Sequence, residues 1–305
     1  MIRPLTPELA KIAKEELNEN PNQTSSDLQH LKDWISKQPH LKARTDDQWL
    51  IALLRGSKFS LEKVKKKLDL YYTLRTTAPD LTLRIKPTDP KFFEFFRLGT
   101  CLILPKPKDK LIPRVILIRA GRYDASVYNV ADVMCMFYYL VQILVMEDDA
   151  ACVLGTKIVT DYEEVSMTHF MQGTPSMLKK MVAVCQDSMP LRLKGSHHIN
   201  LPSGVEKVFV LVQGFLNEKA KKRLKIHKNP EELLEHIPKE IVPVEYGGTG
   251  GTIPELIEYW VAKFKEYHDW MKVEEQLGTD ESKRLGPPIA ADLMADGSFR
   301  KLDID

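Results

Sequence analysis

The sequence predicts a helical N-terminal region followed by an α/β domain. Before Gly99 the apolar residues recur only at helical spacing. After Gly99, short β-rich runs separated by turn residues alternate with helical segments, and this alternation predicts an α/β domain with at least part of its sheet parallel. With 305 residues, of which 43% are hydrophobic, the chain can form two domains or one large one, each with a core.

Local signals place the N-terminal helices. Thr6-Pro7 begins the first, and a stripe at helical spacing marks the second. Thr45 and Ser60 are expected to cap the third and the fourth. In the fourth helix the lysines are expected to face water while the apolar residues face inward. Those lysines are Lys63, Lys65, Lys66 and Lys67. Asp89-Pro90 begins a short aromatic helix that ends at Gly99.

The α/β region reads as strands and helices in turn. A pair of strands, a long apolar helix and a strand entered through glycine come first, and a helix capped by Thr174 and ended by Pro190 follows. A further strand, a lysine-rich helix, a β-like run and a helix opened by Pro254 complete the order. The strands are expected at 101–105, 114–118, 155–161, 197–200 and 240–246, and the long helix at 130–146. The composition of the tail from Gln276 predicts mobility, with Phe299 and Leu302 as the residues able to hold it.

The stretch from Pro190 to Arg223 holds an almost wholly apolar segment between basic groups. Ser203 followed by Glu206 is a capping-box pattern, which predicts a helix from Gly204 or Val205. Such a helix would be apolar nearly all round and would serve as a lid over a lipid cavity at a membrane. The alternation of the valines between 208 and 212 equally fits a buried strand, so both interpretations stay open at this point.

Composition excludes several classes of protein. A net charge of +2 does not fit a basic nucleic-acid binder, so any attraction to membranes must come from local patches. The charged N-terminus predicts no secretory signal, and Asp132 and Gln142 make the long apolar helix a buried one. We therefore expect a cytosolic protein whose membrane contact is peripheral. Four widely spaced cysteines fit reduced thiols: Cys101, Cys135, Cys152 and Cys185.

Signatures of catalysis and of metal binding are scarce. The chain has no GxSxG, HExxH or P-loop motif. His197 and His198 are adjacent on an expected strand, so they point to opposite faces and cannot readily share a metal. The run from Gly247 to Gly251 lacks the third glycine of a dinucleotide loop, where Thr252 stands, and is expected to be a turn. We expect no cofactor.

A basic cluster is a second candidate feature. In the segment 217–226 the apolar residues Leu216, Ala220 and Leu224 recur every four residues and are expected to be buried on a helix. The basic residues would then cover the remaining arc, and Arg192 and Lys194 would join them if the fold brings them together. Near an anionic leaflet each charge contributes roughly 1 kcal/mol of attraction. A merely solvated helix face explains the same pattern. The basic residues of the segment are Lys219, Lys221, Lys222, Arg223 and Lys225.

Four segments carry a resemblance to a known family. They are LLRGSKFSLEKV (53–64), KIVTDYEEVS (157–166), the run TPSMLKKMVAVCQDSMPLRLKGSHHINLP (174–202) and EYGG (245–248). In this order they resemble the CRAL-TRIO lipid-transfer family, in the branch of alpha-tocopherol transfer protein and cellular retinaldehyde-binding protein. The resemblance extends over residues 30 to 252, and the ordered set of motifs is more specific than any single one.

The resemblance implies a fold with one enclosed ligand. Residues 1–97 would form a helical N-terminal domain, residues 98–252 a CRAL-TRIO domain, and residues 253–305 a C-terminal helix and tail. The CRAL-TRIO domain would have a mixed, largely parallel sheet, with the ligand between the sheet and a helical gate at 200–216, which favours the helix in that segment. The gate residues are Val205, Val208, Phe209, Leu211 and Val212.

The resemblance also implies functional residues. Basic residues that hold phosphoinositide headgroups fall at Arg192, Lys194, Lys219 and Arg223, whereas another basic position is replaced by Ser57, with Lys58 beside it. Two threonines and a serine make the implied pocket more polar than one shaped for tocopherol alone, so the identity of the ligand does not carry over. The pocket residues are Tyr138, Val141, Thr156, Ile158, Thr160, Met181, Val184, Cys185, Met189 and Ser196.

These expectations describe a cytosolic, monomeric protein that is not an enzyme. It would bind a small hydrophobic ligand such as tocopherol or a retinoid and deliver it to membranes, with anionic phosphoinositides and no nucleic acid as partners. A sensor or adaptor that binds a phospholipid or phosphoinositide without bulk transfer is the first alternative. An enzyme that uses the loop at Gly247 is the second.

Overall fold

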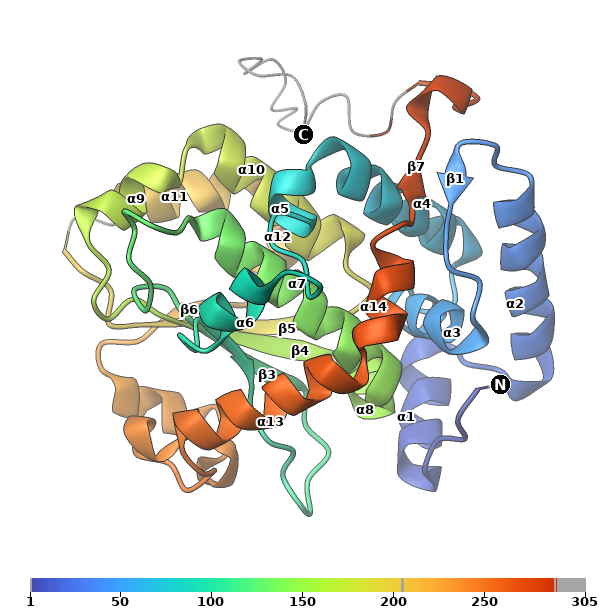
Figure 1. Cartoon of the computed structure of the whole chain (residues 1–305). Helices are drawn as coiled ribbons and strands as arrows, with labels where there is room; N and C mark the ends of the chain where they lie inside the picture. The colour runs from blue at the N-terminus through green and yellow to red at the C-terminus, as the bar shows by residue number, and fades with distance from the viewer. Residues whose placement is uncertain (1, 204–205, 288, 290–305) are drawn as a thin grey trace.

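The computed structural model describes residues 2–203, 206–287 and 289. As predicted, the N-terminal region is helical (Figure 1). A two-residue strand, β1 (Leu41–Lys42), interrupts it. The helices are α1 (Pro7–Leu17), α2 (Pro21–Ser36), α3 (Asp47–Gly56), α4 (Leu61–Thr77), α5 (Pro79–Thr82) and α6 (Pro90–Phe96).

The helix starts follow the sequence signals with one shift. The Thr6 hydroxyl accepts a hydrogen bond from the Leu9 amide at 3.4 Å, and the Asp89 carboxylate accepts one from the Lys91 amide at 2.9 Å. Ser60 occupies the capping position of α4 as expected, but its side chain makes no capping hydrogen bond. The capping position of α3 is Asp46 and not Thr45, because the helix begins one residue later than predicted.

Two lysines of α4, Lys65 and Lys67, are half-buried and not exposed as predicted. The Lys65 side chain is 17% exposed and lies 2.8 Å from the carboxylate of Glu62. The Lys67 ammonium donates hydrogen bonds to the backbone carbonyls of Asp187 at 2.9 Å and Met189 at 2.8 Å. Lys63 and Lys66 are exposed, in line with the prediction. Helical spacing places Lys67 on the edge of the polar arc, and only the packing of a distant segment against α4 shows that this edge is covered.

A five-stranded sheet forms the centre of the α/β region. Its order is β2-β3-β4-β5-β6; β2 and β3 are antiparallel and the other neighbours are parallel, so the sheet is mixed and mostly parallel, as predicted. The strands are β2 (Cys101–Ile103), β3 (Arg114–Arg119), β4 (Thr156–Asp161), β5 (Leu193–Ile199) and β6 (Leu224–Ile226).

Helices connect the parallel strands. The crossovers are α7 (Val130–Glu147) with α8 (Asp149–Leu154), then α9 (Met167–Gln172) with α10 (Pro175–Ala183) and a π-helical turn, η1 (Val184–Ser188), then α11 (Glu206–Phe215) with α12 (Glu218–Lys221). In Figure 1, α10 and α11 lie above the sheet and α13 (Ile253–Glu266) lies below it. The Trp260 indole on α13 donates to the carbonyl of Ile103 at 2.9 Å, which fixes this helix against β2.

The long apolar helix α7 is the centre of the core. Every residue from Ala131 to Val145 is buried. In the described part of the chain it is the one helix long and apolar enough to cross a membrane, and 83% of its apolar window is buried inside the protein. The prediction of a buried helix is therefore confirmed.

Two elements predicted between residues 217 and 246 are wrong. The lysine-rich helix ends at Lys221, and Leu224–Ile226 forms the edge strand β6, which pairs with Ser196–His198 and leaves Ile226 52% exposed. The run 240–246 forms two 3-10 turns, η3 (Lys239–Ile241) and η4 (Val244–Tyr246), and not a strand. Pro238 and Pro243 precede these turns and supply no amide hydrogen to a strand ladder.

The glycine-rich loop is a turn, as predicted. Gly247 has a φ of 74° and Gly251 a φ of 88°, a region that favours glycine. Thr252 then caps α13 in a capping box with Glu255.

The described part of the tail is held against the N-terminal helices. After α14 (His268–Glu274), strand β7 (Gly278–Thr279) pairs with β1. The Arg284 guanidinium donates to both carboxylate oxygens of Asp69 on α4, each at 2.9 Å. The composition-based prediction of a mobile tail is thus wrong as far as Arg284, because an ion pair distant in sequence fixes it. Phe299 and Leu302 lie outside the described residues.

Candidate functional site

The sheet brings four predicted pocket residues onto one face. Alternation along β4 places Thr156, Ile158 and Thr160 on the same side. Ile158 pairs directly with Ser196 of β5, and Thr160 pairs with His198. Thr156 is buried, whereas Ile158, Thr160 and Ser196 are only half-buried in the middle of the sheet. These residues form a floor of mixed polarity, which we call the β4–β5 floor.

Four more predicted residues follow one another through α10 and η1. Met181 and Cys185 are half-buried and pack against the main hydrophobic core, whereas Val184 and Met189 are fully buried. Burial raises the pKa of the Cys185 thiol to about 12, so this side chain stays neutral and behaves as a small apolar group. Ala183 is the one buried residue of α10, so side chains on both faces of this helix are partly exposed.

The two predicted residues of α7 are buried in the core. Val141 is 2% exposed and Tyr138 is 1% exposed. The Tyr138 hydroxyl accepts a hydrogen bond from the Arg75 guanidinium at 3.1 Å, and its ring stacks on Tyr71 at 5.3 Å between centroids. The polar end of Tyr138 is therefore already satisfied by α4.

A chain of three polar side chains joins β4 and β5 on the floor. The Tyr162 hydroxyl lies 3.2 Å from His198 Nδ1, and the Ser196 hydroxyl lies 2.9 Å from His198 Nε2. We call these three residues the hydroxyl relay. Of these three residues, only Ser196 was predicted as a site residue. Side chains alternate between the two faces of a strand, so the spacing that places Thr160 and Ser196 on the floor also places Tyr162 and His198 there, and this signal was missed.

The predicted gate is a helix, α11 (Glu206–Phe215). Phe209 is 8% exposed, and its ring packs edge-on against His198 at 4.9 Å and lies 6.0 Å from Tyr162. Val210, the next residue, is 68% exposed. Leu211 and Val212 are half-buried. Val205 and the side chain of Val208 lie outside the described residues, as does Gly204.

The four predicted basic residues lie close enough to repel one another. The positive charge of Arg223 lowers the pKa of Lys219, with smaller contributions from burial and from Arg192. Burial lowers the pKa of Lys194, and the charges of Arg192 and Arg223 add to this. Lys58 and Lys63, at the start of α4, also lower the pKa of Lys219. Lys58 thus contributes positive charge beside the position where Ser57 departs from the family pattern.

The basic cluster is partly engaged with the backbone. The Arg192 guanidinium donates to the carbonyl of Val153, and the Arg223 guanidinium donates to that of Leu193. Lys194 lies 3.6 Å from the carboxylate of Glu16 on α1. The Nε of Arg192 is buried and has no hydrogen-bond partner within the described ranges.

The opposite face of β5 carries a histidine stack. His197 Nδ1 lies 2.9 Å from His227 Nε2, and both rings lie 5.3 Å from that of His236. His197 and His198 thus point to opposite faces, as predicted. Over residues 2–203, 206–287 and 289 no group of three or more His, Cys, Asp or Glu side chains has a geometry that holds a metal.

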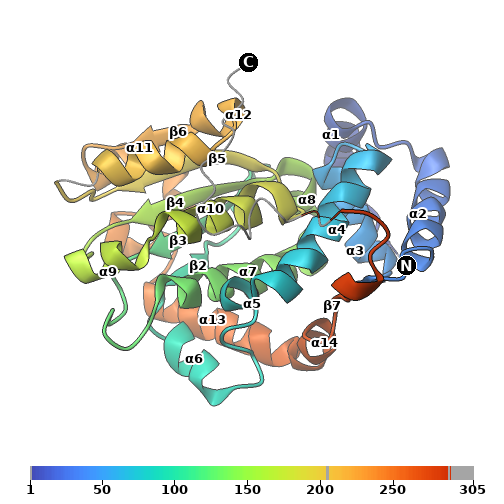
Figure 2. The same cartoon turned by 90° about the horizontal axis from the view of Figure 1, so that it is seen from above.

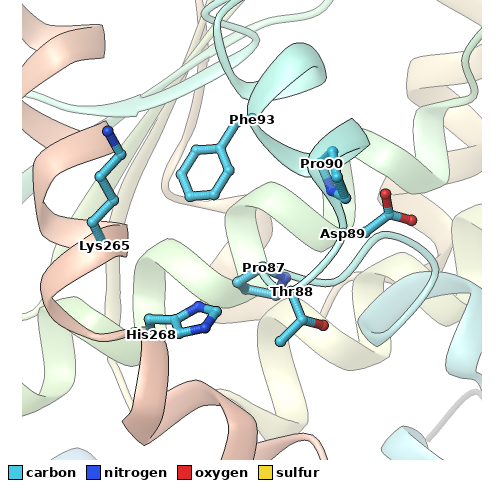
Figure 3. A pocket seen from close by; sticks show the side chains of 7 residues that line it. All are labelled: Pro87, Thr88, Asp89, Pro90, Phe93, Lys265 and His268. Atoms are coloured by element: carbon cyan, nitrogen blue, oxygen red, sulfur yellow. The ribbon is translucent and has the colours of Figure 1, made fainter.

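Two surface pockets lie elsewhere. The larger, of about 460 Å³, lies between the loop before α6 and the junction of α13 with α14 (Figure 3). Figure 3 shows Phe93, Lys265 and His268 at its rim, together with Asp89, which already caps α6. The smaller, of about 330 Å³, is lined by residues of the loops after β3 and β4, among them Tyr123, and by His169 of α9. Neither pocket is lined by any of the ligand-pocket, gate or basic residues predicted from the sequence.

Comparisons with known proteins agree with this architecture. The family model of the CRAL/TRIO domain matches residues 99–248, and that of the Pinta-like UBA domain matches residues 20–92. The chain is similar to alpha-tocopherol transfer protein-like from Homo sapiens, with 31% identity over 82% of this chain and 72% of the relative. It is similar to clavesin-2 from Rattus norvegicus, with 30% identity over 80% of this chain and 75% of the relative.

A solved structure shares the fold. The crystal structure of Sfh5 superposes with a TM-score of 0.52 at 12% identity, and the match covers 88% of this chain and 100% of that chain. At this identity the likeness concerns the fold alone.

Proposed function

Because this chain belongs to the CRAL/TRIO domain family, a family of lipid-binding domains, we propose that it binds one hydrophobic lipid and transfers it between membranes. Tocopherol, a retinoid or a similar isoprenoid is the proposed cargo. The proposal rests on the β4–β5 floor. Its central residues are half-buried, although α10 and α11 lie above the sheet.

The partial exposure of these inward-facing side chains supports a space for an apolar ligand. A helix packed directly on a sheet buries a whole face, but α10 buries Ala183 alone. Met181 and Cys185 on that helix and turn and Ile158 on the floor would contact the ligand. Enclosing an isoprenoid chain at about 25 cal/mol per Å² of apolar area makes a soluble complex favourable without covalent chemistry. We therefore propose a carrier and no catalytic role.

Exposed apolar residues on the same side of the sheet support a membrane step. Met167 and Met171 on α9 are 73% and 76% exposed, and Val210 on α11 is 68% exposed. In Figure 1 both helices lie above the sheet, with α10. Figure 2, seen from above, shows α10 continuing from α9, and α11 near β6. Exposed apolar groups of this size fit the interface of a bilayer, and the basic cluster would add attraction to anionic lipids.

The basic cluster would hold the headgroup of a phosphoinositide at that surface. Mutual repulsion among Arg192, Lys194, Lys219 and Arg223 disfavours the empty cluster, and a polyanionic headgroup relieves it. The buried Arg192 Nε would supply one hydrogen-bond donor to a phosphate oxygen. On this proposal the protein is cytoplasmic and associates with membranes transiently, through their surface.

The test compares two charge reversals on α12. Lys219 faces the cluster, whereas Lys221, two residues later, pairs with Glu218 at 2.8 Å. Lys219→Glu is expected to slow the delivery of a fluorescent tocopherol analogue to vesicles that contain phosphoinositide by up to about thirtyfold, since a reversal removes one attraction and adds a repulsion of roughly 1 kcal/mol each. Lys221→Glu is the matched control and should change the rate less than about twofold.

Equilibrium binding of the analogue should be the same in both variants, and the rate of the wild type should fall as salt rises. Equal rates for the two variants at low salt would show that the cluster is only a solvated surface. Failure of the wild type to bind any of the lipids would overturn the proposed function itself.

A further inference from the structure

The hydroxyl relay has one more hydrogen than its two contacts use. Burial, followed by the charge of His227, lowers the pKa of His198 to about 4, so at neutral pH the imidazole carries one N–H and one acceptor nitrogen. The Tyr162 and Ser196 hydroxyls each carry one hydrogen. Three donors therefore serve two contacts, of 3.2 and 2.9 Å.

Both arrangements of the hydrogens leave the spare donor at an end of the relay. If His198 donates from Nδ1 to Tyr162, then Ser196 donates to Nε2 and the tyrosine hydrogen is free. If His198 donates from Nε2 to Ser196, then Tyr162 donates to Nδ1 and the serine hydrogen is free. Neither hydroxyl has a further hydrogen bond to another group in the described parts of the chain.

The relay lies under the gate helix and beside the centre of the β4–β5 floor. His198 is 9% exposed, and the Phe209 ring of the gate covers it edge-on at 4.9 Å. Phe209 also lies 6.0 Å from the Tyr162 ring. Ser196 pairs with Ile158, at the centre of the β4–β5 floor. Tyr162 and Ser196 are half-buried, so the spare hydroxyl at either end of the relay lies on the floor proposed to contact the ligand, where a lipid that displaces water would leave it unpaired.

We infer that the hydroxyl relay is the polar anchor of the ligand and that it selects lipids whose apolar chain carries an oxygen able to accept a hydrogen bond. The inference rests on the proposed function and adds the chemical class of the cargo. Because either end of the relay can hold the free hydrogen, the anchor adapts to an oxygen at either of two positions. A bare hydrocarbon leaves the donor unpaired.

The test uses two lipids with one carbon skeleton. Phytanol and phytane are saturated isoprenoids that differ in a single hydroxyl group. Uptake by the full-length protein from neutral phosphatidylcholine vesicles is measured for each lipid alone and in competition. The wild type is expected to prefer phytanol by about tenfold, since a site built around a hydrogen bond rejects the analogue that lacks it.

A double variant removes both hydroxyls on which the spare hydrogen can lie. Tyr162→Phe with Ser196→Ala is expected to reduce the preference to less than about threefold, while the uptake of phytane stays unchanged. The control is His197→Leu, which alters the adjacent histidine on the opposite face of β5 and should keep the full preference. Thermal unfolding of each variant verifies that it is folded.

The outcomes separate the inference from the function on which it rests. Equal uptake of the two lipids by the wild type would overturn the polar anchor and leave lipid binding intact, whether or not the double variant folds. A folded double variant that keeps the tenfold preference would also overturn it. No uptake of phytanol or phytane, and none of α-tocopherol or retinol under the same conditions, would contradict the proposed function.

Discussion

Lys67 joins the N-terminal helices to the turn that precedes β5. Its ammonium donates to the carbonyls of Asp187 and Met189, the last turn before the strand that carries Ser196. Burial lowers its pKa to about 8, which shows how little water surrounds the charge. No local pattern distinguishes this lysine from Lys66, since both lie on the polar arc of α4. Its role becomes visible only when residues far apart in sequence are packed together.

Replacing Lys67 is expected to weaken this connection. Lys67→Met keeps the length of the side chain but leaves two carbonyls without their donor, so the free energy of unfolding should fall by about 1–2 kcal/mol. Urea unfolding measures the change. Lys66→Met, on the exposed neighbour, is the control and should stay within about 0.5 kcal/mol of the wild type. Equal midpoints for the two variants would show that the contacts of Lys67 add nothing to stability.

His197 makes stability depend on pH. Burial lowers its pKa to about 3, and the charges of His227, Lys157 and His236 add to this. Between pH 6.5 and pH 4 the unfolded chain binds a proton at this position and the folded chain does not. The free energy of unfolding should therefore fall as pH decreases, by up to about 1.4 kcal/mol per pH unit for this residue.

In the variant His197→Leu, unfolding should take up about one proton fewer than in the wild type, so the free energy of unfolding should depend less steeply on pH. His30→Leu, at an exposed position of α2, should leave this dependence unchanged. Urea unfolding at a series of pH values between 4 and 7 provides the comparison. A slope that is unchanged in His197→Leu would mean that the histidine stack takes up its protons without unfolding.

At the scale of the element, α11 decides how the gate works. The sequence left helix and strand equally open until a resemblance favoured the helix, because an apolar run of this length has no distinctive period. The helix places Phe209 inward on His198 and Val210 outward. On the proposed function, these neighbouring residues would have different roles, Phe209 in holding the gate closed and Val210 at the surface.

Two aspartate substitutions test this division. Val210→Asp adds a charge at a position that is 68% exposed, so the melting temperature should stay within a few degrees while co-sedimentation with anionic vesicles falls severalfold. Phe209→Asp buries an unpaired carboxylate and should cost about 3 kcal/mol or more. Severe destabilisation by both would place the whole segment in the core and remove the gate from the mechanism.

The elements that could be predicted have strong local signals. The helix at 130–146 is apolar apart from Asp132 and Gln142. Thr174 marks the start of a helix and Asn200 the end of a strand. The edge strand β6 could not be predicted, because three residues, Leu224 to Ile226, form it only by pairing with Ser196–His198. The run 240–246 has the composition of a strand, yet its prolines prevent the ladder.

At the scale of the molecule, the fold class could be predicted and the assembly of the site could not. Alternating strands and helices identify an α/β domain from local patterns alone. By contrast, the relay requires the register between β4 and β5, and the described tail is fixed by the contact of Arg284 with Asp69. The domain boundary expected near residue 97 stays a prediction; one hydrophobic core extends across it, from Leu53 on α3 to Leu140 on α7.

Native mass spectrometry after incubation with lipid vesicles tests the central claim most directly. The wild type, exposed in turn to vesicles that contain α-tocopherol, retinol or phytanol, is expected to yield a complex of one chain with one lipid molecule for at least one of them. The added mass should disappear in the presence of organic solvent, since no covalent bond is formed. A chain that stays free of all three lipids and retains a phospholipid or a nucleotide instead would contradict the account.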